Sequence, residues 1–124
     1  MDHEVVLARS LAAVFEQLAA PQRLSDWLPE VAAGRDAAAA TGIGAAFGLR
    51  LCRDGRETSG IGELTAYEPP WCVTYRLIFG SRTYVLRVTC ANIRGATRVS
   101  VSQAGPPPSL VVDLGLLYEA GPQV

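Results

Sequence analysis

The chain has 124 residues, of which 49% are hydrophobic and 19% charged, and its formal net charge is −1. A chain of this length forms one domain with an ordinary core, so we expect residues 1–124 to be a single domain. The near-neutral charge and the scattered basic residues argue against a nucleic-acid partner. No stretch approaches the length of a membrane span and no signal-peptide pattern opens the chain, so we expect a cytoplasmic protein.

The cysteines give no sign of a metal site or a catalytic thiol. Cys52, Cys72 and Cys90 show no C-x-x-C spacing, and the only histidine is His3. A catalytic thiol needs a nearby base and a zinc site needs further ligands, so we predict no metal and no cofactor. The three thiols are expected to be small buried hydrophobic side chains in a reduced compartment.

The first thirty residues predict a strand followed by two short helices. The strand is expected over residues 4–8, and Ser10 is placed to cap the first helix. That helix has an apolar stripe of Leu11, Val14, Phe15 and Leu18. A second short helix is expected from Pro21 to Pro29, with Leu24, Trp27 and Leu28 on one face.

The middle of the chain predicts an antiparallel meander. Residues 31–44 are ambiguous because four alanines favour a helix and the glycines favour a strand with a turn, and we predict an irregular strand. From Ala45 onward five runs alternate in hydrophobicity: AFGLRLCR, ETSGIGELTAY, WCVTYRLIF, TYVLRVTCAN and ATRVSVSQA. Turn residues separate them, including Pro69-Pro70, where no sheet ladder can pass. After GPPPS, the apolar spacing predicts a helix over residues 110–120.

Alternation assigns most of the apolar side chains of this meander to one face of the sheet. The inward positions are Phe47, Leu49, Leu51, Val73, Tyr75, Leu77, Tyr84, Leu86, Val88, Cys90, Val99, Val101 and Gln103. The outward positions include Arg50, Arg76, Arg87 and Arg98. The inward face lines either a cavity or a filled core, because apolar alternation permits both.

Several segments together resemble the SRPBCC superfamily of START-like, helix-grip proteins, in particular its polyketide cyclase/dehydrase-like members. They are VLARSLAAVFEQLAAPQRLSDWLPEV, TGIGAAFGLRL, SGIGELTAYEPPWCVTYRL and GATRVSVSQAG. The resemblance implies an α+β fold: a curved antiparallel sheet with two short helices after the first strand and a C-terminal helix over the concave face. The chain departs from the pattern at Arg9-Ser10, where Ala-Pro is common, and in the short segment after Pro108.

The resemblance implies an apolar cavity for a small hydrophobic, polyketide- or lipid-like molecule. A cyclase or dehydratase that templates its substrate and transfers protons is one function of such a cavity. The alternative is a binder without catalysis, such as a carrier, a sequestering resistance protein or a receptor-like module. The expected ligand contacts are Trp27, Phe47, Leu49, Leu51, Val73, Tyr75, Leu77, Tyr84, Leu86, Val88, Val99, Val101, Gln103, Leu114 and Tyr118.

The polar groups expected near such a ligand are few. Tyr75 and Tyr84 are candidate proton donors, or tyrosines whose hydroxyls reach water. Glu63 is a third catalytic candidate if it faces the cavity, where its pKa would be raised, and a surface residue if Leu64 faces inward instead. Gln103 offers a donor and an acceptor at the end of an inward row.

The run LVVDLGLLYEA, residues 110–120, is apolar around most of a helical wheel. A helix of that kind must be covered on both sides, and eleven residues span only about 16 Å. We therefore expect a homodimer in which this helix packs against the partner chain.

Overall fold

The computed structural model of the chain describes residues 2–40 and 42–117. Its helical elements are α1 (Leu11–Leu18) and the 3-10 helices η1 (Pro21–Asp26), η2 (Arg35–Ala39) and η3 (Leu114–Leu116). Its strands are β1 (Asp2–Leu7), β2 (Val31–Ala33), β3 (Ala46–Arg53), β4 (Arg56–Glu68), β5 (Cys72–Phe79), β6 (Arg82–Ile93) and β7 (Ala96–Ala104). Apart from η2, the order of elements agrees with the sequence-based expectation up to β7.

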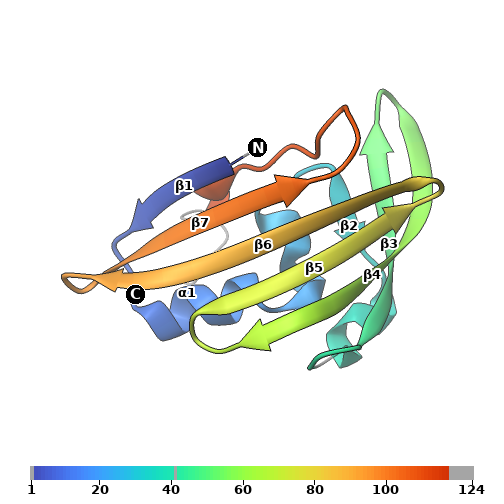
Figure 1. Cartoon of the computed structure of the whole chain (residues 1–124). Helices are drawn as coiled ribbons and strands as arrows, with labels where there is room; N and C mark the ends of the chain where they lie inside the picture. The colour runs from blue at the N-terminus through green and yellow to red at the C-terminus, as the bar shows by residue number, and fades with distance from the viewer. Residues whose placement is uncertain (1, 41, 118–124) are drawn as a thin grey trace.

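The seven strands form one antiparallel sheet in the order β1-β7-β6-β5-β4-β3-β2. The sheet curls, and α1 and η1 lie on its concave side (Figure 1). Ser10 caps α1, since its hydroxyl accepts a hydrogen bond from the Ala13 N–H at 3.2 Å. The curved antiparallel sheet with two short helices after β1 confirms the predicted α+β architecture.

Two-residue turns give the meander its hairpins. Asp54 and Gly55 have φ angles of 52° and 73°, the left-handed pair that a type I′ turn requires. Gly80 has a φ of 63° at the first position of the β5–β6 turn. Turns of these kinds match the twist of the flanking strands, and a two-residue turn fixes which residues of the two strands pair. The β3–β4 and β5–β6 turns consequently lie at the same end of the sheet (Figure 1).

Two glycines let β4 approach its neighbours closely. A Cβ on Gly62 would lie 2.7 Å from the Phe47 ring, and one on Gly60 would overlap the Ile78 carbonyl oxygen and the Phe79 ring. Both glycines face the concave side, where larger side chains from β3 and β5 fill the space above them. Glycines at these positions permit bends in a curved sheet.

A β-bulge between Leu64 and Ala66 changes the alternation of β4. Leu64 faces the interior, and beyond the bulge Tyr67 returns to the same side, opposite Val73. The Tyr67 ring lies 5.9 Å from the Phe15 ring of α1. The bulge therefore brings the end of β4 against the first helix.

Two segments differ from the prediction. Residues 31–44 are not one irregular strand but β2 followed by η2, because the Asp36 carboxylate accepts the Gly48 N–H at 3.0 and 3.1 Å and holds the turn against β3. The helix predicted from Leu110 is also wrong for its first four residues. Residues 110–113 are not helical, the 3-10 turn begins only at Leu114, and Tyr118 to Ala120 lie outside the described residues.

Candidate functional site

The inward face of the sheet is a filled core in this structure. Seven of its side chains have no surface that water reaches, so no water-sized space touches them: Val73, Tyr75, Leu77, Tyr84, Leu86, Val88 and Val99. Phe47, Leu49, Leu51, Val101 and Gln103 are also buried, together with Trp27 and Leu114. The assignment of these side chains to the inward face of the sheet is confirmed. Their role as ligand contacts stays a prediction. Tyr118, the remaining expected contact, lies outside the described residues.

Tyr75 lies at the centre of this core. Its hydroxyl donates a hydrogen bond to the Leu18 carbonyl at 2.7 Å, and its ring contacts Trp27 and Phe47 at centroid distances of 6.2 and 6.5 Å. Burial, and secondarily the neighbouring Tyr67, raises the pKa of the Tyr75 phenol well above its usual range. Tyr75 is therefore a neutral donor at physiological pH, and its proton is already committed to the backbone.

Tyr84 and Gln103 also bind the backbone. The Tyr84 hydroxyl donates to the Pro108 carbonyl at 2.9 Å. The Gln103 side chain donates to the Leu110 carbonyl at 3.1 Å and accepts the Leu110 N–H at 2.7 Å. Both side chains thus fix the segment that follows β7, and Gln103 uses both its donor and its acceptor to do so.

Glu63 does not face the interior. It forms an ion pair with Arg76 on the outer face of the sheet, while its neighbour Leu64 is buried. Of the two alternatives for Glu63, the inward carboxylate is wrong and the surface residue is the one observed, because the strand directs Leu64 to the core side. Tyr75, Tyr84 and Glu63 do not converge on one point as a catalytic group.

Trp27 has a polar atom that the core leaves unsatisfied. The side chain is fully buried, and its Nε1–H has no hydrogen-bond partner in the described part of the chain. A buried donor without an acceptor costs free energy, on the order of 1–3 kcal/mol. An acceptor atom brought to Trp27 would recover that free energy.

A hollow of about 370 Å³ lies between α1, η1, η2 and the end of β4. Its apolar walls include Ala12, Phe15, Leu64, Tyr67 and Pro70, and Glu16 and Gln22 supply side-chain polar groups. A hollow of this size, apolar with a few polar groups, is typical of small-molecule sites. Sequence reasoning missed it, although the turn at Pro70, which ends β4 beside α1, was visible in the sequence.

The hollow is adjacent to the core around Trp27. Leu64, at its floor, is the cross-strand neighbour of Tyr75, and the Tyr75 ring contacts Trp27. Leu64 and Tyr75 therefore connect the floor of the hollow to the core around Trp27. The hollow and the unpaired indole N–H together form the candidate binding site.

A partly buried polar network centred on Gln17 holds the two helical walls of the hollow together. The Arg9 guanidinium donates to the Gln17 side-chain oxygen at 2.8 Å, and the Gln17 amide donates to Asp26 at 3.2 Å. Arg23 pairs with the same Asp26 carboxylate at 2.8 Å. Gln17 is 1% exposed, so this network fixes α1 relative to η1 from within the fold.

The described residues contain no group of three or more His, Cys, Asp or Glu side chains that could hold a metal ion. Burial raises the pKa of the Cys90 thiol to about 11, with nearby Cys72 adding to the shift. A thiol with a raised pKa is a poor nucleophile at neutral pH. No helix in residues 2–40 or 42–117 is long and apolar enough to cross a membrane.

The curled seven-stranded sheet, the two short helices on its concave side and the apolar hollow beside them define a helix-grip domain. The chain belongs to the family described as polyketide cyclase / dehydrase and lipid transport, whose model matches residues 1–116. This match confirms the resemblance to the SRPBCC superfamily. No curated protein matches the sequence.

Solved structures share the fold at low sequence identity. The protein CV1439 from Chromobacterium violaceum is 18% identical, with a TM-score of 0.68 over 87% of this chain and 80% of that chain. The protein DR_A0006 from Deinococcus radiodurans is 14% identical, with a TM-score of 0.68 over 85% and 81% of the two chains. DynU16, a protein of the dynemicin biosynthetic locus, is 20% identical, with a TM-score of 0.60 over 87% of this chain and 38% of that chain.

Proposed function

We propose that the protein binds a small hydrophobic molecule, lipid- or polyketide-like, which enters through the hollow between α1 and β4. The observation that carries the proposal is the apolar hollow, whose floor of Phe15 and Leu64 adjoins the core around Trp27. The family, which combines cyclases and dehydrases with lipid transport, supports the same class of ligand.

The ligand would combine an apolar body with a hydrogen-bond acceptor. The apolar body would lie against Phe15 and Tyr67, and the acceptor would reach the Trp27 N–H after Leu64 moves aside. Burial of apolar surface contributes most of the binding free energy. The hydrogen bond to Trp27 adds selectivity, because this donor has no partner in the described part of the chain.

Binding without catalysis is the better supported form of this function. The Tyr75 hydroxyl is held by a backbone carbonyl, and Glu63 lies outside in an ion pair. A cyclase or dehydratase is the second candidate, and the observation in its favour is the Glu16 carboxylate beside the hollow. Templating by the walls and proton transfer by Glu16 would then be the catalytic elements.

Two uncharged fluorescent probes test the proposal. Nile red carries a carbonyl acceptor, and diphenylhexatriene is a hydrocarbon without one. Ala12→Trp would place a large side chain in the hollow from an exposed position of α1 and should weaken both probes at least about tenfold by removing apolar contact area. Ala104→Trp, at an exposed position at the end of β7, is the matched control and should leave both affinities unchanged.

Trp27→Phe tests the hydrogen bond separately. Loss of one neutral hydrogen bond, about 1 kcal/mol, should weaken Nile red about fivefold and leave diphenylhexatriene unchanged. Circular dichroism verifies that each variant is folded. Unaltered binding of both probes to folded Ala12→Trp would contradict the proposed entrance, and equal losses for both probes in Trp27→Phe would contradict the role of the indole N–H.

A further inference from the structure

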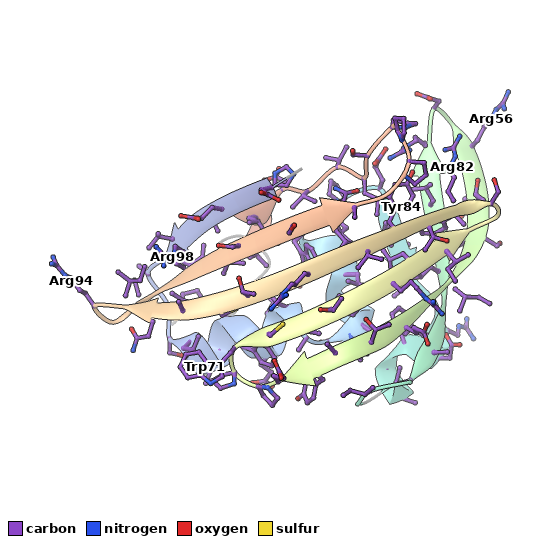
Figure 2. The ribbon with its side chains drawn as sticks, viewed as in Figure 1. Arg56, Trp71, Arg82, Tyr84, Arg94 and Arg98 are labelled. Atoms are coloured by element: carbon purple, nitrogen blue, oxygen red, sulfur yellow. The ribbon has the colours of Figure 1, made fainter. Side chains whose placement is uncertain are left out.

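Two arginines occupy equivalent positions at the hairpin tips, at the end of the sheet opposite Pro70. Arg56 is the first residue of β4, directly after the Asp54-Gly55 turn, and Arg82 is the first residue of β6, directly after Gly80-Ser81. Because β4 pairs with β5, the two tips are neighbours. Figure 2 shows Arg56 and Arg82 at this end of the molecule and Arg94 at the other.

The strand register places these arginines on the concave side of the sheet. Arg56 pairs with Arg53, two residues beyond the inward-facing Leu51, and Arg82 pairs with the inward-facing Phe79. A hollow of about 480 Å³ lies between the tips, with Leu51 and Phe79 among its lining residues. Both of these apolar side chains are 3% exposed, so only a small part of each reaches the hollow below the charged groups.

The charge of this hollow is not balanced from within the described chain. Arg53 is neutralised by Glu30, at 2.9 and 3.0 Å, and it also donates to the carbonyls of Pro108 and Ser109. Arg56 and Arg82 form no ion pair with a described carboxylate. Asp54 is the one acidic side chain among the described lining residues, and it offsets only one of the two guanidinium charges.

We propose that this hollow, here called the hairpin-tip site, binds a phosphomonoester that carries an apolar group. Guanidinium groups bind phosphate oxygens through paired, charge-assisted hydrogen bonds, so Arg56 and Arg82 hold the phosphate between the tips. The Thr58 hydroxyl, which also lines the hollow, supplies a further donor. The apolar group lies against the aliphatic stems of the arginines and the small part of Leu51 and Phe79 that lines the hollow. The hairpin-tip site does not depend on the proposed function, whose hollow lies at the other end of the sheet.

The site is tested by titrating the protein with phenyl phosphate. Binding is measured from the NMR chemical shifts of the backbone amides at the two tips, such as those of Gly55, Gly80 and Ser81. Saturable shifts at both tips are expected. The double variant Arg56→Gln/Arg82→Gln should weaken binding at least about tenfold, since two charge-assisted interactions are lost. Arg94→Gln/Arg98→Gln makes the same change in net charge away from this site and should bind as the unaltered protein does (Figure 2).

A second experiment decides whether the phosphate belongs to a lipid or to a soluble molecule. The protein is sedimented with vesicles of phosphatidylcholine that contain phosphatidic acid, and with vesicles of phosphatidylcholine alone. Sedimentation with phosphatidic acid that Arg56→Gln/Arg82→Gln abolishes identifies a lipid, whereas phenyl phosphate binding without sedimentation identifies a soluble phosphomonoester. Equal losses in both double variants, or inorganic phosphate binding as tightly as phenyl phosphate, would overturn the proposal. So would the absence of tip shifts and of sedimentation. Nile red binding to Arg56→Gln/Arg82→Gln should be unaltered, which separates this test from that of the proposed function.

Discussion

Tyr75 shows how a side chain suited to catalysis is used for stability. Leu18 is the last residue of α1, so no N–H group of the helix donates a hydrogen bond to its carbonyl. The Tyr75 hydroxyl satisfies this carbonyl inside the core. The pairing attaches the end of α1 to the middle of β5, and burial keeps the phenol neutral by raising its pKa.

Tyr75→Phe should therefore lower the free energy of unfolding by about 1–3 kcal/mol, because the Leu18 carbonyl stays buried without a donor. Tyr67→Phe is the matched control, since Tyr67 is 38% exposed and its hydroxyl has no hydrogen bond to a described residue. Urea unfolding of the two variants measures the difference. A loss of stability in Tyr67→Phe as large as that in Tyr75→Phe would contradict the role of the hydroxyl.

Sequence alternation identifies which residues face inward but not what each polar group contacts. Tyr75, Tyr84 and Gln103 all lie on the predicted side, and each binds a backbone group brought close only by the tertiary fold. Alternation also does not distinguish a cavity from a filled core, since both require the same apolar rows. In β4, the sequence did not show whether Glu63 or its neighbour Leu64 faces inward. In the structure Leu64 is buried in the core, so Glu63 faces outward.

At the scale of elements, strand prediction succeeded because alternation and turn chemistry agree along the meander. The run AFGLRLCR coincides with β3, and ATRVSVSQA coincides with β7. The run ETSGIGELTAY misses one residue at each end of β4. Where a single signal stood alone the prediction failed. The helical spacing after Leu110 did not form a helix there, because Gln103 binds both backbone groups of Leu110 in a non-helical segment.

The curvature of β4 gives a prediction at this scale. Gly60→Ala should reduce the free energy of unfolding by about 1–3 kcal/mol, because its Cβ would overlap the Ile78 carbonyl, which belongs to the backbone and cannot rotate away. Gly48→Ala, in the neighbouring β3, is the control. Its Cβ would lie 3.6 Å from an Asp36 oxygen, an ordinary contact.

Thermal unfolding of both glycine variants measures the difference. A Gly60→Ala variant as stable as Gly48→Ala would mean that β4 moves away from β5 at little cost.

For the whole molecule, the described segment from the end of β7 to Asp113 is bound to the sheet and is not helical. Leu110 is 2% exposed, so this residue is not available for contact with another chain, whereas Val111 is 49% exposed. The homodimer predicted through residues 110–120 stays a prediction. Residues 110–113, the first four of this run, lack the helical geometry on which the homodimer prediction rested.

Glu30 is the centre of a set of contacts, here called the tether, that binds the segment after β7 to the sheet. Its carboxylate accepts hydrogen bonds from Arg53, at the end of β3, and from the Val111 N–H at 3.0 Å. Arg53 in turn donates to the carbonyls of Pro108 and Ser109. One ion pair thus joins the loop before β2, the end of β3 and the chain beyond β7. The hydrogen bond from Arg53, more than the Val111 N–H, lowers the pKa of Glu30 against the opposing effect of burial.

A carboxyl group whose pKa is lower in the folded than in the unfolded state stabilises the fold when the pH is above its unfolded-state pKa. This contribution disappears as the pH falls through its folded-state pKa. Glu30→Gln should therefore lower the free energy of unfolding by about 2 kcal/mol at pH 7, through loss of charge-assisted hydrogen bonds at a largely buried position. The difference from the unaltered protein should shrink as the pH falls below 4.5, the ordinary value for this carboxyl. Glu57→Gln removes the same charge from an exposed pair with Arg50 and should have little effect at either pH. Urea unfolding at pH 7 and pH 3 distinguishes the two variants, and a difference for Glu30→Gln that stays constant between these pH values would show that the carboxylate charge does not hold the tether.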